Sequence, residues 1–164
     1  AYSISIALMK NKTLIIGVIY DPNQDEMFYA WKNGGAYLNG SLISVSETDN
    51  LSEALLATGF PYYNYEKLEA YMDILIWLMN NSRGIRRIGS AAIDLAYVAC
   101  GRFEGFYEYS LNPWDVAAGV IIVNESGGCV TDFKGGENYL FGKEILASNL
   151  KLRNELLSKI KNTF

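Results

Sequence analysis

The sequence has 164 residues, half of them hydrophobic, which is the size and composition of one globular domain with a buried core. A net charge of −4 disfavours nucleic acid as the main partner, and the longest apolar runs, "TLIIGVIY" and "AAGVIIV", are too short to cross a membrane. The chain contains no histidine, which excludes Ser-His-Asp and Cys-His nucleophile systems and histidine-ligated zinc within it.

The first third of the chain shows the alternation of polar and apolar residues that is typical of β-strands. Strands are predicted at 2–9, 13–20, 26–31, 42–46 and 54–60, with "DPNQDE" as a hairpin turn. Short turns between successive strands favour an antiparallel sheet.

From residue 66 the apolar residues recur at helical spacing, and helices alternate with strands. Helices are predicted at 66–80, 90–101, 113–126 and 150–162, and strands at 84–89, 102–109, 129–133 and 144–148. We therefore expect an α/β (α+β) fold: an antiparallel-sheet lobe over residues 1–62, followed over residues 63–164 by an α/β lobe with a mixed, mostly parallel sheet.

The two cysteines and the glycines give little sign of a cofactor site. Cys100 and Cys129 form no C-x-x-C pair, so we interpret them as buried or half-buried reduced thiols of a cytoplasmic protein. Neither of the common glycine-rich nucleotide-binding motifs is present, which leaves an ATP or NAD site without support. Carboxylates, hydroxyls, backbone amides, lysine or a hard metal ion must carry any chemistry.

Asp115 stands at the start of an otherwise apolar helix. Asn112 is a favoured N-cap and Pro113 a favoured first helical residue, which makes Trp114 the second residue and Asp115 the third. We expect Pro113 and Trp114 to shape this start rather than to touch a ligand. An aspartate in a first turn is stabilised by the helix dipole, so Asp115 can be structural or can face a site.

Glu108 and the Gly89-Ser90 pair can reach the same edge of the second sheet as Asp115. Glu108 ends the preceding strand, while Gly89 and Ser90 lead from a strand to a helix N-terminus, whose N–H groups suit an anion or a hydroxyl. Gly89 and Ser90 can equally form a plain turn and cap. Carboxylates without histidine or cysteine favour Mg²⁺ or Ca²⁺, and Mg²⁺ is commonly held by one or two carboxylates together with substrate phosphate.

Several segments, taken in order, cover nearly the whole chain: "YSISIALM", "GVIYDPNQDEMFYAWKNGGAYLNG", "ATGFPY", "RRIGSAAIDLAYVACGRFEGFYE", "NPWDVAAGVIIVNESGG" and "ILASN". They resemble the inositol monophosphatase family, whose members are Mg²⁺-dependent, lithium-sensitive phosphatases of small phosphomonoesters. The resemblance implies an inositol-monophosphatase-like fold, Mg²⁺ as cofactor, a small phosphorylated polyol or sugar as substrate, and a homodimer.

The resemblance also implies roles for individual residues. Asp115 matches the aspartate that ligates the metal and helps hold the attacking water, so it is the expected catalytic and metal-binding residue. Glu108 matches the acid that contacts a substrate hydroxyl. Gly89, Ser90 and Ala91 match the segment whose backbone lines the sugar or inositol pocket.

Two family motifs do not occur in this sequence. Members carry a Glu-Glu pair and a D-P-x-D-G-T motif, which supply most of the metal ligands, ahead of the segments matched here. The Asp21-Pro22 pair is no substitute, because Gln24 stands where the second Asp should be. We therefore expect the C-terminal part of such an enzyme, which binds Mg²⁺ weakly and hydrolyses no phosphate ester alone. Asp25 and Glu26 are expected to be solvated turn charges.

The remaining residues of interest have mainly structural interpretations. Asp94 and Asp132 are assigned to structure, whereas Arg86 and Arg87 lie either near a substrate phosphate or at a dimer contact. Aromatic residues at strand or helix spacing are expected in the core or in a subunit interface: Tyr29, Trp31, Tyr71 and Trp77.

Three functions remain open on the sequence. The first is part of an inositol-1-monophosphatase-like enzyme that uses metal-activated water. The second keeps the superfamily but changes the substrate to fructose 1,6-bisphosphate or a 3'(2'),5'-bisphosphate nucleotide. The third is a non-catalytic remnant used for subunit association or ligand binding.

Overall fold

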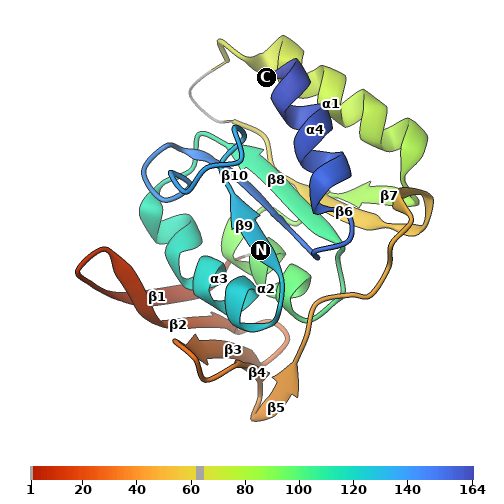
Figure 1. The fold of residues 1–164 in the computed structure, drawn as a ribbon. Helices are drawn as coiled ribbons and strands as arrows, with labels where there is room; N and C mark the ends of the chain where they lie inside the picture. The colour runs from red at the N-terminus through yellow and green to blue at the C-terminus, as the bar shows by residue number, and fades with distance from the viewer. Residues whose placement is uncertain (1, 62–64) are drawn as a thin grey trace.

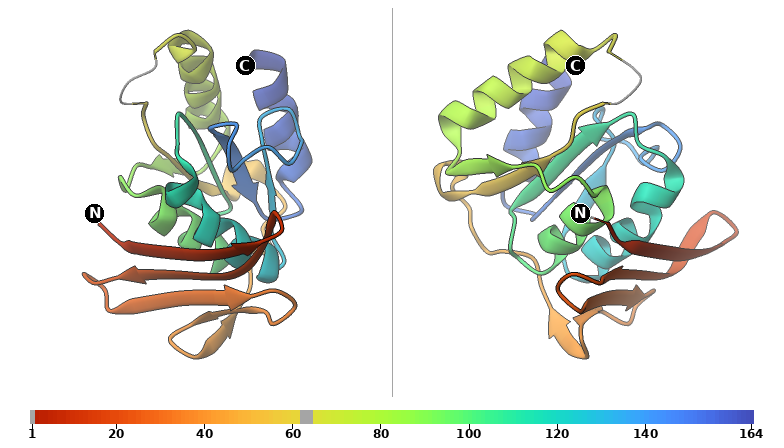
Figure 2. Two further views of the ribbon diagram at one scale, coloured as in Figure 1. Left: turned by 90° about the vertical axis from the view of Figure 1, so that its left-hand side faces the viewer. Right: turned by 180° about the vertical axis from the view of Figure 1, so that it is seen from behind.

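The computed structural model describes residues 2–61 and 65–164, in which two β-sheets enclose a layer of helices (Figures 1 and 2). The first sheet contains β1 (Ile4–Lys10), β2 (Thr13–Asp21), β3 (Glu26–Trp31), β4 (Ala36–Leu38) and β5 (Ser41–Ile43). The second sheet contains β6 (Leu55–Thr58), β7 (Gly84–Arg86), β8 (Gly105–Tyr109), β9 (Cys129–Thr131) and β10 (Glu144–Ser148).

The helices form two layers, one between the sheets and one outside the second sheet (Figure 1). The inner layer holds α2 (Ala91–Ala99) and α3 (Pro113–Glu125), the outer layer holds α1 (Leu68–Asn81) and α4 (Arg153–Thr163), and a short 3₁₀ turn η1 (Leu51–Glu53) precedes β6. No helix in the described ranges has the length and apolar character needed to span a membrane.

The first sheet is antiparallel throughout, in the order β1-β2-β3-β4-β5. Its inner face packs on the helices through buried residues such as Ile19, Phe28 and Ala36. The predicted hairpin turn between β2 and β3 is confirmed, because Asp21 pairs with Glu26 across it. The sequence prediction missed β4, since its three residues lie within a glycine-rich stretch that is typical of turns.

The second sheet is mixed, as predicted, in the order β7-β6-β8-β10-β9. β6 runs parallel to β7 and to β8, whereas β10 is antiparallel to β8 and to β9. Half of the described pairs are therefore antiparallel, more than the mostly parallel sheet expected. The physical reason is that no helix joins β9 to β10, so the chain returns beside itself without a crossover.

The two predicted lobes share one core. α2 and α3 pack on buried residues of both sheets, including Phe28 from β3 and Phe106 from β8. β6 lies within the range 1–62 assigned to the first lobe, yet it pairs in the second sheet. The predicted boundary at residues 62 and 63 lies outside the described residues, so the division into lobes stays a prediction.

Two glycines allow α3 to lie unusually close to its neighbours. A Cβ at Gly17 of β2 would lie 2.6 Å from the Ala118 carbonyl oxygen, and a Cβ at Gly119 would lie 2.5 Å from Leu95 of α2. Glycine inside a helix destabilises it by about 1 kcal/mol relative to alanine. Gly119 therefore serves packing, because only a missing side chain lets the two helices approach this closely.

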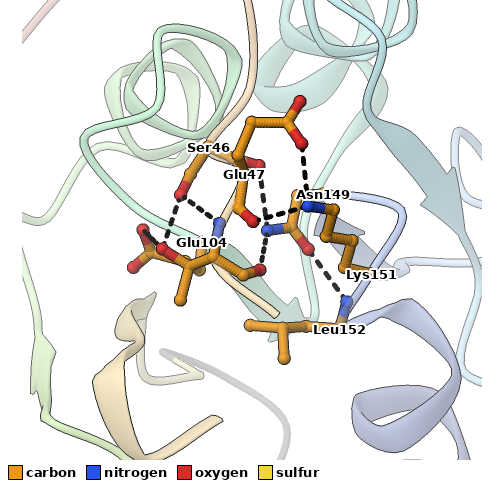
Figure 3. Close-up of polar contacts among 7 residues, drawn as sticks. Ser46, Glu47, Glu104, Asn149, Lys151 and Leu152 are labelled. Atoms are coloured by element: carbon orange, nitrogen blue, oxygen red, sulfur yellow. Dashed lines mark hydrogen bonds and ion pairs between the residues drawn. The ribbon is translucent and has the colours of Figure 1, made fainter. Parts of the chain in front are cut away.

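The segment that leads from β5 to β6 is fastened to the second sheet by polar side chains (Figure 3). The Asn149 amide group donates to the carbonyl oxygens of Ser46 (3.0 Å) and Thr48 (2.8 Å), and its oxygen accepts from the Leu152 N–H group at 2.9 Å. The buried Glu104 accepts from the Leu55 N–H group at 2.6 Å. These contacts fix where the chain passes from one sheet to the other.

The outer face of the first sheet is apolar and exposed. In the register of the strands, Ile6, Val18, Tyr29, Tyr37 and Leu42 form one row on the face opposite α3. Ile6 is 61% exposed and Leu42 is 70% exposed. The ring of Trp31 stacks on the ring of Tyr37, a member of this row, with centroids 5.2 Å apart and planes 5° apart. A continuous apolar surface of this kind promotes association with other protein.

Replacing Gly119 by alanine should destabilise the chain by about 1–3 kcal/mol, because the new methyl group would push α3 away from Leu95. Urea unfolding of wild type and variant measures the change in free energy. Asn124→Ala, an exposed substitution on the same helix, is the matched control and should be neutral or slightly stabilising. Equal stability of Gly119→Ala and wild type would contradict the close approach of the two helices.

Replacing Ile6 by lysine should weaken self-association of the chain at least about tenfold, because it places a charge within the apolar outer face. Sedimentation equilibrium over a range of protein concentrations measures the effect. Ser41→Lys adds the same charge at an exposed position of β5 and should leave association unchanged. A strictly monomeric wild-type chain would show that this face does not drive association.

Candidate active site

A cavity of about 560 Å³ opens at the carboxyl edge of the second sheet. β6, β7 and β8 run parallel there, so their carboxyl ends meet at one edge, and the chain enters α2 and α3 at the same edge. The lining residues come from five segments of the chain: Tyr2, Ser3 and Ser5; Gly59, Phe60 and Pro61; Arg87; Gly89, Ser90, Ala91 and Ala92; and Glu108, Tyr109, Ser110, Leu111, Asn112, Trp114 and Asp115.

All five residues singled out from the sequence line this cavity. Glu108 comes from β8, Asp115 from the first turn of α3, and Gly89, Ser90 and Ala91 from the start of α2. The structure thus brings them together, while the chemical roles implied for them stay predictions.

The start of α3 positions Asp115 as the sequence indicated. Pro113 is the first helical residue, and the Asn112 N–H group donates to Asp115 Oδ2 at 2.9 Å. This bond fixes one carboxylate oxygen of a residue that lines the cavity. Trp114 is 69% exposed and lines the cavity, and the expectation that it shapes the helix start rather than touches a ligand stays a prediction.

The start of α2 offers backbone N–H groups at the cavity wall. Gly89 has a φ of +93°, a left-handed conformation that glycine adopts without strain and that turns the chain into the helix. The Ser90 hydroxyl lies 3.1 Å from the Ser3 hydroxyl. The chain segment ahead of β1 in the first sheet therefore closes one side of the site.

Glu108 is buried at the base of the site, with 6% of its surface exposed. The pKa of its carboxyl group is raised to about 8, first by burial and then by the neighbouring carboxylates of Asp94 and Asp115. The Arg87 guanidinium lowers the same pKa but does not cancel the effect. At neutral pH Glu108 is therefore largely protonated and can donate as well as accept a hydrogen bond.

Asp94 of α2 is a second buried carboxyl group near Glu108. It is 1% exposed, and its Oδ1 atom has no hydrogen-bond partner within the described part of the chain. Its pKa is raised to about 7, because the effect of burial outweighs the lowering by the Arg87 guanidinium. Asp94 is not among the residues that line the cavity. The prediction that it has a structural role and not a catalytic one remains a prediction.

The structure decides several of the other assignments. The Asp132 carboxylate accepts backbone N–H groups from residues 134, 136 and 138, which supports a structural role in that loop. The expectation that Glu26 is a solvated turn charge is wrong, because the start of β3 lies beside the end of α2 and Glu26 binds Arg102 through both carboxylate oxygens. Asp25 accepts the Tyr20 hydroxyl at 2.8 Å in an exposed turn.

The structure also shows where the arginine, aromatic and cysteine residues discussed from the sequence lie. Arg87 lines the cavity, whereas Arg86 bonds its neighbouring carbonyl at Ile85. Tyr71 lies fully buried in the core between α1 and the second sheet, as expected. The two cysteines, Cys100 and Cys129, are half-buried free thiols.

Residues far away in the sequence complete the site and were not predicted. Ser3, Ser5 and Gly59 line the cavity although they precede the α2 segment by 30 residues or more. No local pattern marks them, because their membership follows only from how the two sheets pack. For Gly59 it follows from the parallel pairing of β6 with β8, which the sequence did not predict.

The described residues contain no group of three or more histidine, cysteine, aspartate or glutamate side chains that could hold a metal ion. Asp115 is nevertheless a suitable single ligand, since it supplies a hard oxygen donor to the cavity. Mg²⁺ commonly keeps several waters and binds one or two carboxylates together with substrate phosphate. The residues present therefore fit part of a Mg²⁺ site and not a complete protein cage.

Comparison with known proteins gives a consistent result. The model of the inositol monophosphatase family matches residues 1–163. The Nus factor SuhB of Escherichia coli K12 is 41% identical over 161 residues, which is 98% of this chain and 60% of that protein.

Two solved structures match almost the whole chain. The crystal structure of the suhB protein of Bartonella henselae matches 99% of this chain and 62% of its own, with 41% identity and a TM-score of 0.93. The inositol monophosphatase of Anabaena matches 100% of this chain and 65% of its own, with 40% identity and a TM-score of 0.92. The chain thus spans about 60 to 65% of the length of these proteins.

The raised pKa values of Asp94 and Glu108 predict that the chain loses stability as the pH rises. A carboxyl group whose pKa is higher in the folded chain binds its proton more tightly there, so folding is favoured at low pH. The free energy of unfolding should fall between about pH 4 and pH 8, by roughly 4 kcal/mol for each of the two groups. Urea unfolding at several pH values measures this slope.

Asp94→Asn removes one of the two groups and should make the slope shallower, with its largest stabilising effect near pH 8. Asp73→Asn on the exposed side of α1 is the control and should keep the wild-type slope. If Asp94→Asn keeps the wild-type slope, the pKa of Asp94 is not raised in the folded chain.

Proposed function

Because the chain belongs to the inositol monophosphatase family, we propose that it carries one wall of the active site of a Mg²⁺-dependent, lithium-sensitive phosphomonoester hydrolase. One observation carries this proposal: Glu108, Asp115 and the start of α2 converge on one cavity, although they lie on three different elements. The substrate we propose is a small phosphorylated polyol or sugar, such as inositol monophosphate.

The polyol or sugar part of the substrate would lie between Glu108 and the start of α2. The carboxyl group of Glu108 can exchange hydrogen bonds with a hydroxyl, and burial of that group strengthens the interaction. The N–H groups at the N-terminus of α2 attract a hydroxyl oxygen or an anion, since the helix dipole is positive there. Arg87 adds a positive charge to the same wall.

Asp115 would hold the metal, with its Oδ2 atom already oriented by the Asn112 N–H group. When bound, Mg²⁺ supplies charge neutralisation for the phosphate and a lowered pKa for a bound water. The Glu-Glu and D-P-x-D-G-T motifs of the family are absent from the 164 residues. We propose accordingly that these residues alone bind Mg²⁺ weakly and do not hydrolyse phosphate esters.

Two further attributes belong to the same proposal. The family resemblance and the exposed apolar face of the first sheet support a homodimer. The half-buried free thiols of Cys100 and Cys129 support a location in the cytoplasm.

Other substrates and a non-catalytic role remain as alternatives. Fructose 1,6-bisphosphate and 3'(2'),5'-bisphosphate nucleotides would need room for a second phosphate. The 41% identical relative is named a Nus factor, and this name supports a second candidate, namely a binding protein without turnover. Both alternatives keep the same cavity and differ in what the whole protein does with it.

A chimera provides the test, in which this chain is joined to the part of the Anabaena inositol monophosphatase that it does not span. We expect the chimera to release phosphate from inositol monophosphate when Mg²⁺ is present, and the 164-residue chain to release none. Asp115→Asn in the chimera should lower kcat/KM about 100-fold or more, because a metal ligand is lost. Asp73→Asn, on the exposed side of α1, should leave kcat/KM unchanged.

Trials with fructose 1,6-bisphosphate and a nucleotide bisphosphate distinguish the substrate classes. A chimera that folds and binds inositol monophosphate without releasing phosphate would favour the binding protein. Mg²⁺-dependent phosphate release by the 164-residue chain of verified mass would contradict the proposal that it lacks activity alone.

A further inference from the structure

Gly59 and Glu108 are neighbours across two parallel strands. In the pairing of β6 with β8, Thr58 lies opposite Tyr107, so the residues that follow them, Gly59 and Glu108, come next at the edge. Side chains alternate along a strand, and Glu108 therefore points to the same face as Phe106, toward α2 and α3. Both residues line the cavity.

The carboxyl group of Glu108 occupies the space that a side chain at residue 59 would fill. A Cβ built on Gly59 would meet the Glu108 Cδ, Oε1 and Oε2 atoms at distances that real Cβ atoms do not reach. The backbone of Gly59 is not in the left-handed region. Glycine is thus required at this position for space and not for conformation.

The backbone at Gly59 is held firmly from the opposite side of the sheet. The hydroxyl group of the fully buried Tyr71, on α1, donates to the Gly59 carbonyl oxygen at 2.7 Å and lies 2.5 Å from the Thr58 hydroxyl. The Thr58 hydroxyl in turn donates to the Tyr107 carbonyl oxygen at 2.9 Å. A side chain added at residue 59 would therefore displace the end of the Glu108 side chain sooner than the strand.

We propose that Gly59 is a positioning residue that determines specificity: its missing side chain makes the space in which the Glu108 carboxyl group lies, and so sets the room left for the hydroxylated part of the ligand. A larger residue at this position would push the carboxyl group into the cavity and reduce that room. The nature of the ligand rests on the proposed function, whereas the placement of Glu108 does not.

The first test follows the Glu108 carboxyl group itself, by NMR titration of its ¹³C signal in wild type and in Gly59→Ala. We expect the displaced carboxyl group to be better hydrated and its pKa to fall by about one unit or more in the variant. The titratable and charged groups around Glu108 stay the same in both proteins: Asp94 on α2, Asp115 on α3, Arg87 after β7 and Tyr71 on α1.

Gly84→Ala in the adjacent strand β7 is the matched control. A Cβ there would find its nearest neighbours at 3.6 Å, so this variant should keep the wild-type titration of Glu108. An identical titration in Gly59→Ala, Gly84→Ala and wild type would overturn the proposal. If Gly59→Ala is unstable, the double variant Gly59→Ala with Glu108→Ala should regain stability, and failure to do so would equally overturn it.

The consequence for the ligand is measured in the active chimera. Gly59→Ala should raise KM for inositol monophosphate about tenfold with a smaller change in kcat, because Glu108 contacts a substrate hydroxyl and not the phosphate. An unchanged KM with a displaced Glu108 would refute the specificity role. A chimera without any turnover would refute the proposed function, while the titration would still decide the placement of Glu108.

Discussion

The burial of α3 between two sheets is the constraint on which the rest of this structure depends. Residues 116 to 123 of this helix are all buried, so its middle has no solvent face and only its ends reach solvent. Such a helix can approach a sheet and a second helix closely only where side chains are missing, and Gly17 and Gly119 provide those places. Because the helix cannot shift without overlap, its first turn and Asp115 are held in one position at the sheet edge.

The same packing gives the cavity its electrostatic character. Three carboxyl groups, Asp94, Glu108 and Asp115, lie near one guanidinium, that of Arg87. Burial is the main cause that raises the pKa values of Asp94 and Glu108, so each carboxyl group keeps its proton at a pH at which an exposed carboxyl group has lost it. A protonated carboxyl group in this wall can donate a hydrogen bond as well as accept one. The described residues contain no group of three or more histidine, cysteine, aspartate or glutamate side chains that could hold a metal ion.

Among the relatives, one protein is named an inositol monophosphatase and another a Nus factor. A fold positions groups and does not by itself specify what they do. The features that decide between such functions lie in the site. This chain contributes carboxyl groups and helix starts to that site. The position of Gly59 beside Glu108 shows how a residue without functional groups can still control such a site.

The sequence by itself determined the local features: the alternation of strands and helices, the Asn112-Pro113 start of α3, the turn at Gly89, and the family. The local features depend on contacts within a few residues, which a linear pattern records, whereas the family is recognised from the order of segments along the chain. The tertiary structure alone decided that Ser3 and Gly59 join the cavity, that Glu26 pairs with Arg102, and that β9 and β10 are antiparallel. Burial, pKa and the space beside a glycine depend on residues distant in sequence, and only packing brings those together.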